Sequence, residues 1–304
     1  MRLGLRFPAA AVAVLAAAMG AVLAQSSPAN AAAPTAVTAW YMYGTTESAL
    51  DSAAKSDGCT FARNHPGTGN RVMVLDFGAA RNIAGGWGTV DFSNVEFSNG
   101  KILTALENAS DGVHNCYTQG TTTITYGNSN YHLSSSGMSD SDVYNVGYYQ
   151  EQRAAELATY ESSRPDQYAA AASDMEPSWN GSTNTRELVT GATARAFAVY
   201  YDYGSADGCP TTGSGGSCNN GWSVSTVAYV SFYGEAVPLP EIYRPLSTLA
   251  AQWTVVRRNW NANHSSGYSF WGVTGEPGYA QAGWDDLAND NSGLVARELV
   301  CFGC

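Results

Sequence analysis

Apolar runs typical of buried β-strands alternate with helical patterns along most of this sequence. Strand-like runs occupy residues 71–78 and 121–127, and the longest helical pattern spans 140–160. This alternation predicts a parallel sheet crossed by helices, because parallel strands need a long connection between them. We count about six or seven such units, which predicts an α/β fold, a (β/α)8 barrel of the TIM type with one element undetected.

The other elements follow from the same criteria of periodicity and turn residues. We expect helices over 47–55, 101–109, 187–200 and 245–260, and strands over 36–43, 168–176, 225–234 and 268–273, with a possible short strand over 197–201. A barrel of this type gathers its reactive groups at the carboxyl ends of its strands.

The beginning of the chain has the order of a secretory signal peptide. Arg2 and Arg6 precede an apolar stretch over 7–24, which the small residues Ala29-Asn30-Ala31 follow. We therefore assign 1–31 to a signal peptide and expect 32–304 to form a single catalytic-type barrel domain. No second apolar stretch is long enough to cross a membrane, so we expect a secreted, extracellular protein.

Charge and composition limit the classes of partner. The formal net charge is −11, which argues against binding to nucleic acid or to anionic membrane surfaces. The chain contains 18 Tyr and 8 Trp, whose amphipathic rings suit either the faces of sugars or an aromatic core. A polysaccharide is the partner that we expect, bound by a monomer.

Six cysteines fit an oxidising compartment and a disulfide framework. The sequence does not fix their connectivity. A local bridge between Cys209 and Cys218 would pin the flexible, Gly-rich loop 204–220. Cys59 and Cys116 would then form a long-range bridge, and Cys301 and Cys304 a terminal ring.

Two carboxylates end the strand predicted over 168–176. Asp174 and Glu176 are two residues apart, so in a strand their side chains point the same way. Repulsion and burial then raise the pKa of one of them, which leaves an acid beside an anion. Glycosidic bonds are cleaved by such a pair, although carboxylates at strand ends also cap helices or bind cations.

Other polar and aromatic residues lie at or near the ends of the predicted strands. Asp76 would join the acids or bond backbone amides, and Glu235 is a reserve carboxylate from another strand. Several tryptophans would line a sugar groove or pack in the core. The remaining candidates for this end of the barrel are Tyr126, Asn128, Tyr233, Trp179 and Trp271.

This order of elements resembles the family-18 glycoside hydrolases, the chitinase-like barrels. Their fourth strand carries Asp-Gly-x-Asp-x-Asp-x-Glu, and residues 169–176 read AAAASDME, which keeps the last Asp and the Glu. Their small-polar strand end resembles Thr125-Tyr126-Gly127-Asn128, their Tyr-bearing strand resembles Ser231-Phe232-Tyr233-Gly234, and their closing Trp corresponds to Trp271.

The resemblance implies a role for each matching residue. Glu176 would protonate the leaving oxygen, Asp174 would orient a substrate N-acetyl group that acts as nucleophile, and Tyr233 would hydrogen-bond that group. Ala169 and Ala172 replace two acidic positions, which puts this activity in question. The chain also resembles the family-25 muramidases, in which an early Asp, here Asp76, joins an Asp-x-Glu pair on a middle strand.

The four histidines are scattered without the spacing of a zinc site, and no Gly-x-Ser-x-Gly elbow or phosphate-binding glycine loop is present. We therefore predict no metal and no organic cofactor. The sequence predicts a secreted glycoside hydrolase that cleaves an N-acetylhexosamine-containing polysaccharide, chitin-like or from a cell wall. The alternative is a non-catalytic barrel that binds glycan or a partner protein.

Overall fold

The computed structural model describes residues 33–304 except 68, 85, 117–118, 265–266 and 291–297. Eight parallel strands form a nearly closed barrel in the order β8-β7-β6-β5-β2-β1-β10-β9, which confirms the predicted α/β barrel. The strands are β1 (Val37–Tyr41), β2 (Asn70–Ile83), β5 (Thr121–Ser129), β6 (Gln167–Asp174), β7 (Tyr200–Asp202), β8 (Ala236–Pro238), β9 (Gly272–Gly275) and β10 (Glu298–Phe302).

The barrel closes between β8 and β9 through the segment that follows β8. The backbone N–H of Trp271 donates to Pro238 O (2.9 Å), and Thr274 N–H donates to Pro240 O (2.9 Å). A parallel bridge between Glu241 and Thr274 completes the contact. The chain after β8 is therefore held at the rim of the barrel.

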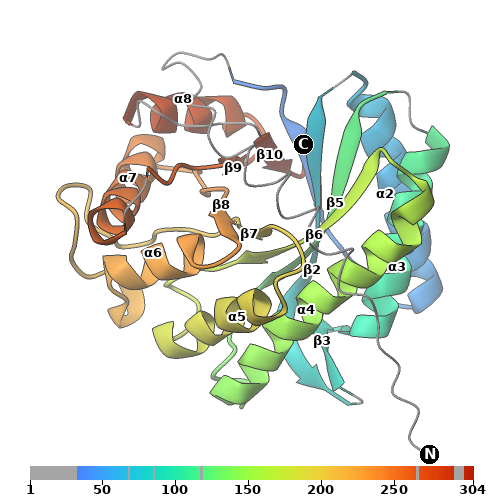
Figure 1. The fold of residues 1–304 in the computed structure, drawn as a ribbon, viewed down its shortest axis with the longest axis horizontal. Coiled ribbons are helices and arrows are strands. Elements are labelled where there is room, and N and C mark those ends of the chain that lie inside the picture. The colour runs from blue at the N-terminus through green and yellow to red at the C-terminus, as the bar shows by residue number, and fades with distance from the viewer. Residues whose placement is uncertain (1–32, 68, 85, 117–118, 265–266, 291–297) are drawn as a thin grey trace, which may run out of the picture.

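Helices surround the strands (Figure 1). They are α2 (Glu47–Asn64), α3 (Asn99–Cys116), α4 (Asp140–Tyr160), α5 (Ser182–Arg195), α6 (Val224–Phe232), α7 (Leu246–Asn263) and α8 (Ala280–Asp290), with two short 3-10 helices, η1 (Glu161–Ser163) and η2 (Asn219–Gly221). The predicted helix over 140–160 is observed with the same bounds, and a capping box between Ser139 and Asp142 begins it.

Glycines bring two pairs of helices into backbone contact. A Cβ on Gly147 of α4 would overlap the Leu188 carbonyl of α5, and one on Gly191 would overlap the Tyr144 carbonyl. Gly58 and Gly112 do the same between α2 and α3. These close crossings fix the spacing of the helix layer and, through it, of the strands that it covers.

The cysteines form three disulfides, Cys59–Cys116, Cys209–Cys218 and Cys301–Cys304. The first joins α2 to α3. The second closes part of the loop predicted over 204–220. A hydrogen bond within this loop, from Asn219 N–H to Asp207 O (3.0 Å), holds it further, and Gln252 Nε2 of α7 donates to Cys209 O (2.9 Å).

The structure corrects several predicted elements. Residues 225–234, predicted as a strand, lie mostly in helix α6, which ends at Phe232, and the strand that follows is the three-residue β8. The strand predicted over 268–273 begins only at Gly272 and is not the last, because α8 and β10 follow it. The hairpin of β3 (Gly86–Val90) and β4 (Glu96–Ser98), which extends β2 beyond the barrel, was not predicted.

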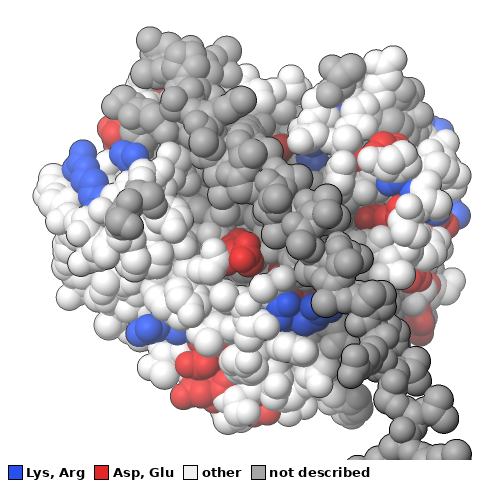
Figure 2. All heavy atoms as spheres, in the orientation of Figure 1, with Lys and Arg blue, Asp and Glu red and all other residues white. Residues whose placement is uncertain are grey.

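Residues 1–31, predicted as a signal peptide, lie outside the described residues. Within the described part of the chain, no helix has the length and apolar character needed to cross a membrane. On the face shown in Figure 2, acidic and basic side chains stand in small separate groups among uncharged surface.

Candidate active site

Asp174 and Glu176 lie at the carboxyl end of β6, as the sequence predicts. Asp174 is the last residue of the strand, and both side chains are almost fully buried, with exposed fractions of 5% and 8%. The loop after β7 approaches closely here, because a Cβ on Gly204 would overlap the Met175 backbone. The glycine therefore allows the loop after β7 to pack directly against the segment that carries both acids.

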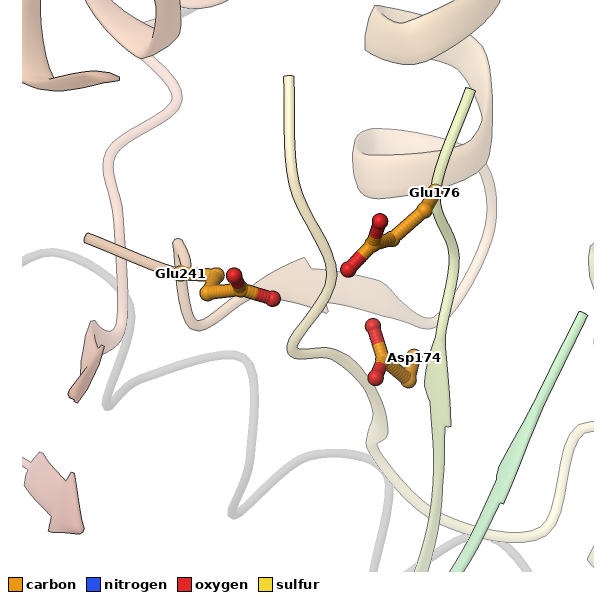
Figure 3. Close-up of side chains that lie close together, drawn as sticks. All are labelled: Asp174, Glu176 and Glu241. Carbon is orange, nitrogen blue, oxygen red and sulfur yellow. The ribbon is translucent and has the colours of Figure 1, made fainter. Parts of the chain in front are cut away.

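A third carboxylate, Glu241, enters from the segment after β8. Its backbone N–H donates to Gly204 O (3.0 Å), which holds it across from β6. One carboxylate oxygen from each of Asp174, Glu176 and Glu241 lies within 4.8 Å of the other two. Figure 3 shows the three side chains pointing toward one another from these two segments.

Burial controls the ionisation of this carboxylate cluster (Asp174, Glu176 and Glu241). It raises the pKa of Glu176 to about 7, with a further contribution from the charge of Asp207. The pKa values of Asp174 and Glu241 are raised well above their ordinary range, first by burial and then by the charge of their neighbours in the cluster.

No Lys or Arg in the described part of the chain forms an ion pair with the cluster. Within the described residues, the ion pairs formed by Lys and Arg involve Asp111 and Glu156, on the helices α3 and α4. A hydrogen bond between the Glu176 and Glu241 side chains lowers the pKa of Glu176 and raises that of Glu241. The two carboxyl groups therefore titrate together, and their pKa values describe the pair and not either residue alone.

Asn130 fixes the backbone of Glu176. Its side-chain amide nitrogen donates to Glu176 O (3.0 Å), and Glu176 N–H donates to Asn130 Oδ1 (3.1 Å). The amide nitrogen also donates to Thr185 Oγ1 of α5 (3.1 Å). Asn130 follows β5 directly, so the loops after β5 and β6 are locked together beside the acid.

Asp76 lies inside the barrel on β2, in register with Tyr41 of β1 and Gly127 of β5. Its Oδ1 accepts a hydrogen bond from Gly78 N–H (2.7 Å), and burial raises its pKa to about 6. Its charge raises the pKa of Asp174. Asp76 therefore stands near the cluster, with one oxygen engaged by the backbone.

Two phenols that the sequence did not single out reach this region. The charges of Asp174 and Asp76 add to burial in raising the pKa of Tyr41. Tyr243, which follows Glu241 by two residues, hydrogen-bonds Tyr41, and burial and the charge of Glu241 raise its pKa. The sequence analysis expected a tyrosine hydroxyl near the acid pair, from Tyr233, and the structure has those of Tyr41 and Tyr243 there.

Tyr233 and Glu235 lie elsewhere. Tyr233 ends α6 and stacks on Tyr229, with ring centroids 4.3 Å apart. Glu235 directly precedes β8, and its backbone carbonyl accepts from Tyr200 N–H (3.0 Å) at the start of β7. Both residues are at the amino ends of the strands, because the segment predicted to be a strand is a helix.

Tyr126 and Asn128 are buried on the side of β5 that faces the helices. The Tyr126 hydroxyl donates to Asn99 Oδ1 of α3 (3.1 Å), and Asn128 Oδ1 accepts from Ser173 Oγ. The structure does not bring either side chain to the carboxylate cluster. Strand alternation explains this, because Asp174 is in register with Ser129, and Tyr126 and Asn128 point the opposite way from that residue.

The two candidate tryptophans differ in position. Trp271 directly precedes β9 and packs against Tyr201, with ring centroids 6.3 Å apart. Trp179 lies in the loop after β6, where its backbone N–H donates to Glu176 O (3.2 Å) and its ring meets Tyr131 edge to face at 5.5 Å. Trp179 is therefore the one that the backbone ties to the acid pair.

The sequence analysis missed Glu241. Its strand, β8, has only three residues and is followed by Pro240, so it lacks the length and alternation of a recognisable strand. The available signal was an apolar run, Ala236 to Pro240, that ends in an acid, as the run before Asp174 does.

The cluster has two chemical uses. Three carboxylate oxygens this close together match the ligands that a divalent cation prefers. In the absence of a cation, the same closeness keeps at least one carboxyl group protonated beside an ionised one, which is the arrangement required for general acid catalysis.

No protein-family model and no curated protein matches this sequence. Among solved structures, a Paenibacillus sp. cycloisomaltooligosaccharide glucanotransferase complexed with cycloisomaltoheptaose is similar, with a TM-score of 0.36 and 11% sequence identity. The similarity covers 80% of this chain, which spans 38% of that enzyme. A similarity of this size supports no inference about the activity of this chain.

Proposed function

We propose that this protein is a glycoside hydrolase that uses the carboxylate cluster at the carboxyl end of its barrel. The observation that carries the proposal is the convergence of Asp174, Glu176 and Glu241 within 4.8 Å, with burial raising the pKa of Glu176 to about 7. A general acid works best when its pKa lies near the working pH. Glu176 is the residue of the cluster that meets this condition.

In the proposed reaction, Glu176 protonates the leaving glycosidic oxygen. As the glycosidic bond breaks, the carbonyl oxygen of a substrate N-acetyl group, oriented by an ionised Asp174 or Glu241, bonds to the anomeric carbon. A water that gives a proton back to Glu176 then opens this intermediate. Closely spaced carboxyl groups, about 5 Å apart, are typical of retaining enzymes, whereas inverting enzymes need about 6.5–9.5 Å to admit a water. The proposed reaction therefore retains the anomeric configuration.

The proposed substrate is an N-acetylhexosamine-containing polysaccharide, either chitin-like or from a cell wall. The resemblance of residues 169–176 to the acidic strand of the family-18 enzymes supports this choice. The three disulfides support an extracellular site of action.

A non-catalytic barrel that binds glycan is the second candidate. The low exposure of Asp174 and Glu176 favours it, as does Ala172, which is buried where the family-18 pattern has an acid. Against it, three carboxyl groups that have no Lys or Arg partner among the described residues are costly to bury in a protein that does no chemistry with them.

The test measures reducing-sugar release from chitin hexasaccharide and from purified cell-wall glycan. Hydrolysis of either glycan, unchanged by a chelator, is the expected result. Loss of activity in chelator with recovery in Ca²⁺ or Mg²⁺ would assign the cluster to a metal, and binding without hydrolysis would favour the non-catalytic barrel.

A further inference from the structure

Several exposed aromatic side chains lie at the carboxyl end of the barrel, the end that carries the carboxylate cluster. Eight aromatic side chains are exposed in the described part of the chain. Four of them follow or end elements at the carboxyl end of the barrel, and they are Tyr41, Tyr43, Phe92 and Tyr131. Exposed apolar groups in such number at one end of a protein mark a binding surface.

The first aromatic group, Tyr41, Tyr43 and Phe92, lies beside β1. The Phe92 ring meets Tyr41 edge to face at 5.3 Å and lies 6.3 Å from Tyr43. Tyr41 also stacks on Phe302 at the end of β10, with centroids 4.7 Å apart, which fixes its ring. Tyr41 lies near the cluster, because the charge of Asp174 adds to burial in raising the pKa of Tyr41.

The second aromatic group, Tyr131, His132 and Trp179, lies on the loops after β5 and β6. Tyr131 stacks on His132 at 3.8 Å and meets Trp179 edge to face at 5.5 Å. Tyr131 follows Asn130, whose side chain bonds the Glu176 backbone twice. The group is therefore fixed relative to the acid from a different side of the barrel, since β1 and β5 are separated by β2.

We infer that these two aromatic groups bind sugar rings on both sides of the bond that is cleaved, so that the protein acts inside a chain of several sugar units. The inference rests on the proposed function, because the carboxylate cluster is taken as the point of cleavage. Rings that are partly exposed and held by neighbouring rings offer flat apolar faces at little entropic cost. Tyrosine hydroxyls beside them suit the hydroxyl groups of an uncharged glycan.

Binding to a protein that cannot turn over the glycan tests the inference. The full-length Glu176→Gln variant is titrated with chitin disaccharide and hexasaccharide, and with cell-wall glycan fragments of matching lengths. We expect the hexasaccharide of the responding glycan to bind at least about tenfold more tightly than the disaccharide, because it reaches both groups. Equal affinity for both lengths would overturn the inference.

Single substitutions in the same background locate the contacts. Phe92→Ala and Tyr131→Ala are each expected to weaken hexasaccharide binding about fivefold, which corresponds to one ring contact. Tyr168→Ala is the matched control, because Tyr168 is 53% exposed and lies at the amino end of β6. Equal loss in the control, or none in the two variants, would contradict the inference.

The two proposals fail separately. If the wild-type protein binds the hexasaccharide through both aromatic groups but does not cleave it, the proposed function is wrong and the inference about the two binding groups stands. If the protein cleaves the hexasaccharide and neither Phe92→Ala nor Tyr131→Ala changes KM, the proposed function stands and this inference is wrong.

Discussion

Asn130 and Glu176 form a closed pair of hydrogen bonds, in which the side-chain amide of one residue pairs with the backbone N–H and C=O of the other (3.1 and 3.0 Å). The pair is buried and joins the loops after β5 and β6. It fixes the backbone that carries the proposed acid without touching the acid's carboxyl group. Asn130 is therefore a positioning residue in the proposed site.

Replacing Asn130 should reduce the rate more than it reduces substrate binding. Asn130→Ala leaves the Glu176 N–H without its partner, and misplacement of the acid is expected to lower kcat about 10- to 100-fold with a smaller change in KM. Steady-state kinetics on the responding glycan check this. Asn263→Ala, which removes an exposed amide, is the control and should change neither constant.

The activity should fall as the pH rises through about 7. Burial and the charge of Asp207 raise the pKa of Glu176 to about 7, and a general acid is active only while it is protonated. Asp207→Asn removes a negative charge and should lower that pKa, which moves the basic limb of the kcat profile to lower pH by roughly half a unit to one unit. A limb that does not move, or that moves to higher pH, would contradict the assignment.

The product of the first turnover should keep the anomeric configuration of the substrate. One carboxylate oxygen from each of Asp174, Glu176 and Glu241 lies within 4.8 Å of the other two, which favours the close spacing of a retaining enzyme over the wider spacing of an inverting one. Proton NMR of the anomeric signals, recorded before mutarotation, measures this outcome. Initial release of the opposite anomer would show that the reaction inverts the configuration, and it would contradict the assignment of this cluster as the reacting carboxylates.

Stability should depend on the glycine contact between α4 and α5. A Cβ on Gly147 would overlap the Leu188 carbonyl, so Gly147→Ala is expected to reduce the free energy of unfolding by about 1–3 kcal/mol. Thermal and denaturant unfolding measure the change. Gly100→Ala is the matched control in α3, where the nearest atom to a new Cβ is 3.9 Å away, and it should be neutral or slightly stabilising.

The barrel was predictable because its long elements carry strong periodic patterns. In the helix over 140–160 and the strands around 71–78 and 121–127, the secondary-structure preference of the residues and the spacing of the buried side chains predict the same structure. The acid pair was predictable for a similar reason, since it ends an apolar run that can only be a buried strand. The sequence did not fix the cysteine connectivity, but the three pairs that it suggested, starting from a local Cys209–Cys218 bridge, are the ones in the structure.

Helix α6 was mispredicted because β-branched and aromatic residues dominate it. Most of the helix is nevertheless buried, and the side chain of Ser223 accepts from Thr226 N–H as an N-cap; the buried residues are Val224, Val227, Ala228, Val230, Ser231 and Phe232. Tertiary packing outweighed local strand preference here. The error moved the predicted strand end to Tyr233 and concealed Glu241.

The outward direction of Tyr126 and Asn128 depends on strand register. Their side chains share a face with Ser173, and a shift of one residue would have placed them inside the barrel. Register is set by pairing with β2 and β6, which the sequence does not specify residue by residue.

The most direct test of the account compares wild type and Glu176→Gln on two substrates, the glycan that responds and a dinitrophenyl glycoside of N-acetylglucosamine. The dinitrophenolate leaves without a proton, so only the glycan needs the acid. We expect Glu176→Gln to lose about 10²- to 10⁴-fold in kcat/KM on the glycan and far less on the aryl glycoside. Equal activity of the variant and wild type on the glycan, or equal losses on both substrates, would contradict the role of Glu176 as the general acid.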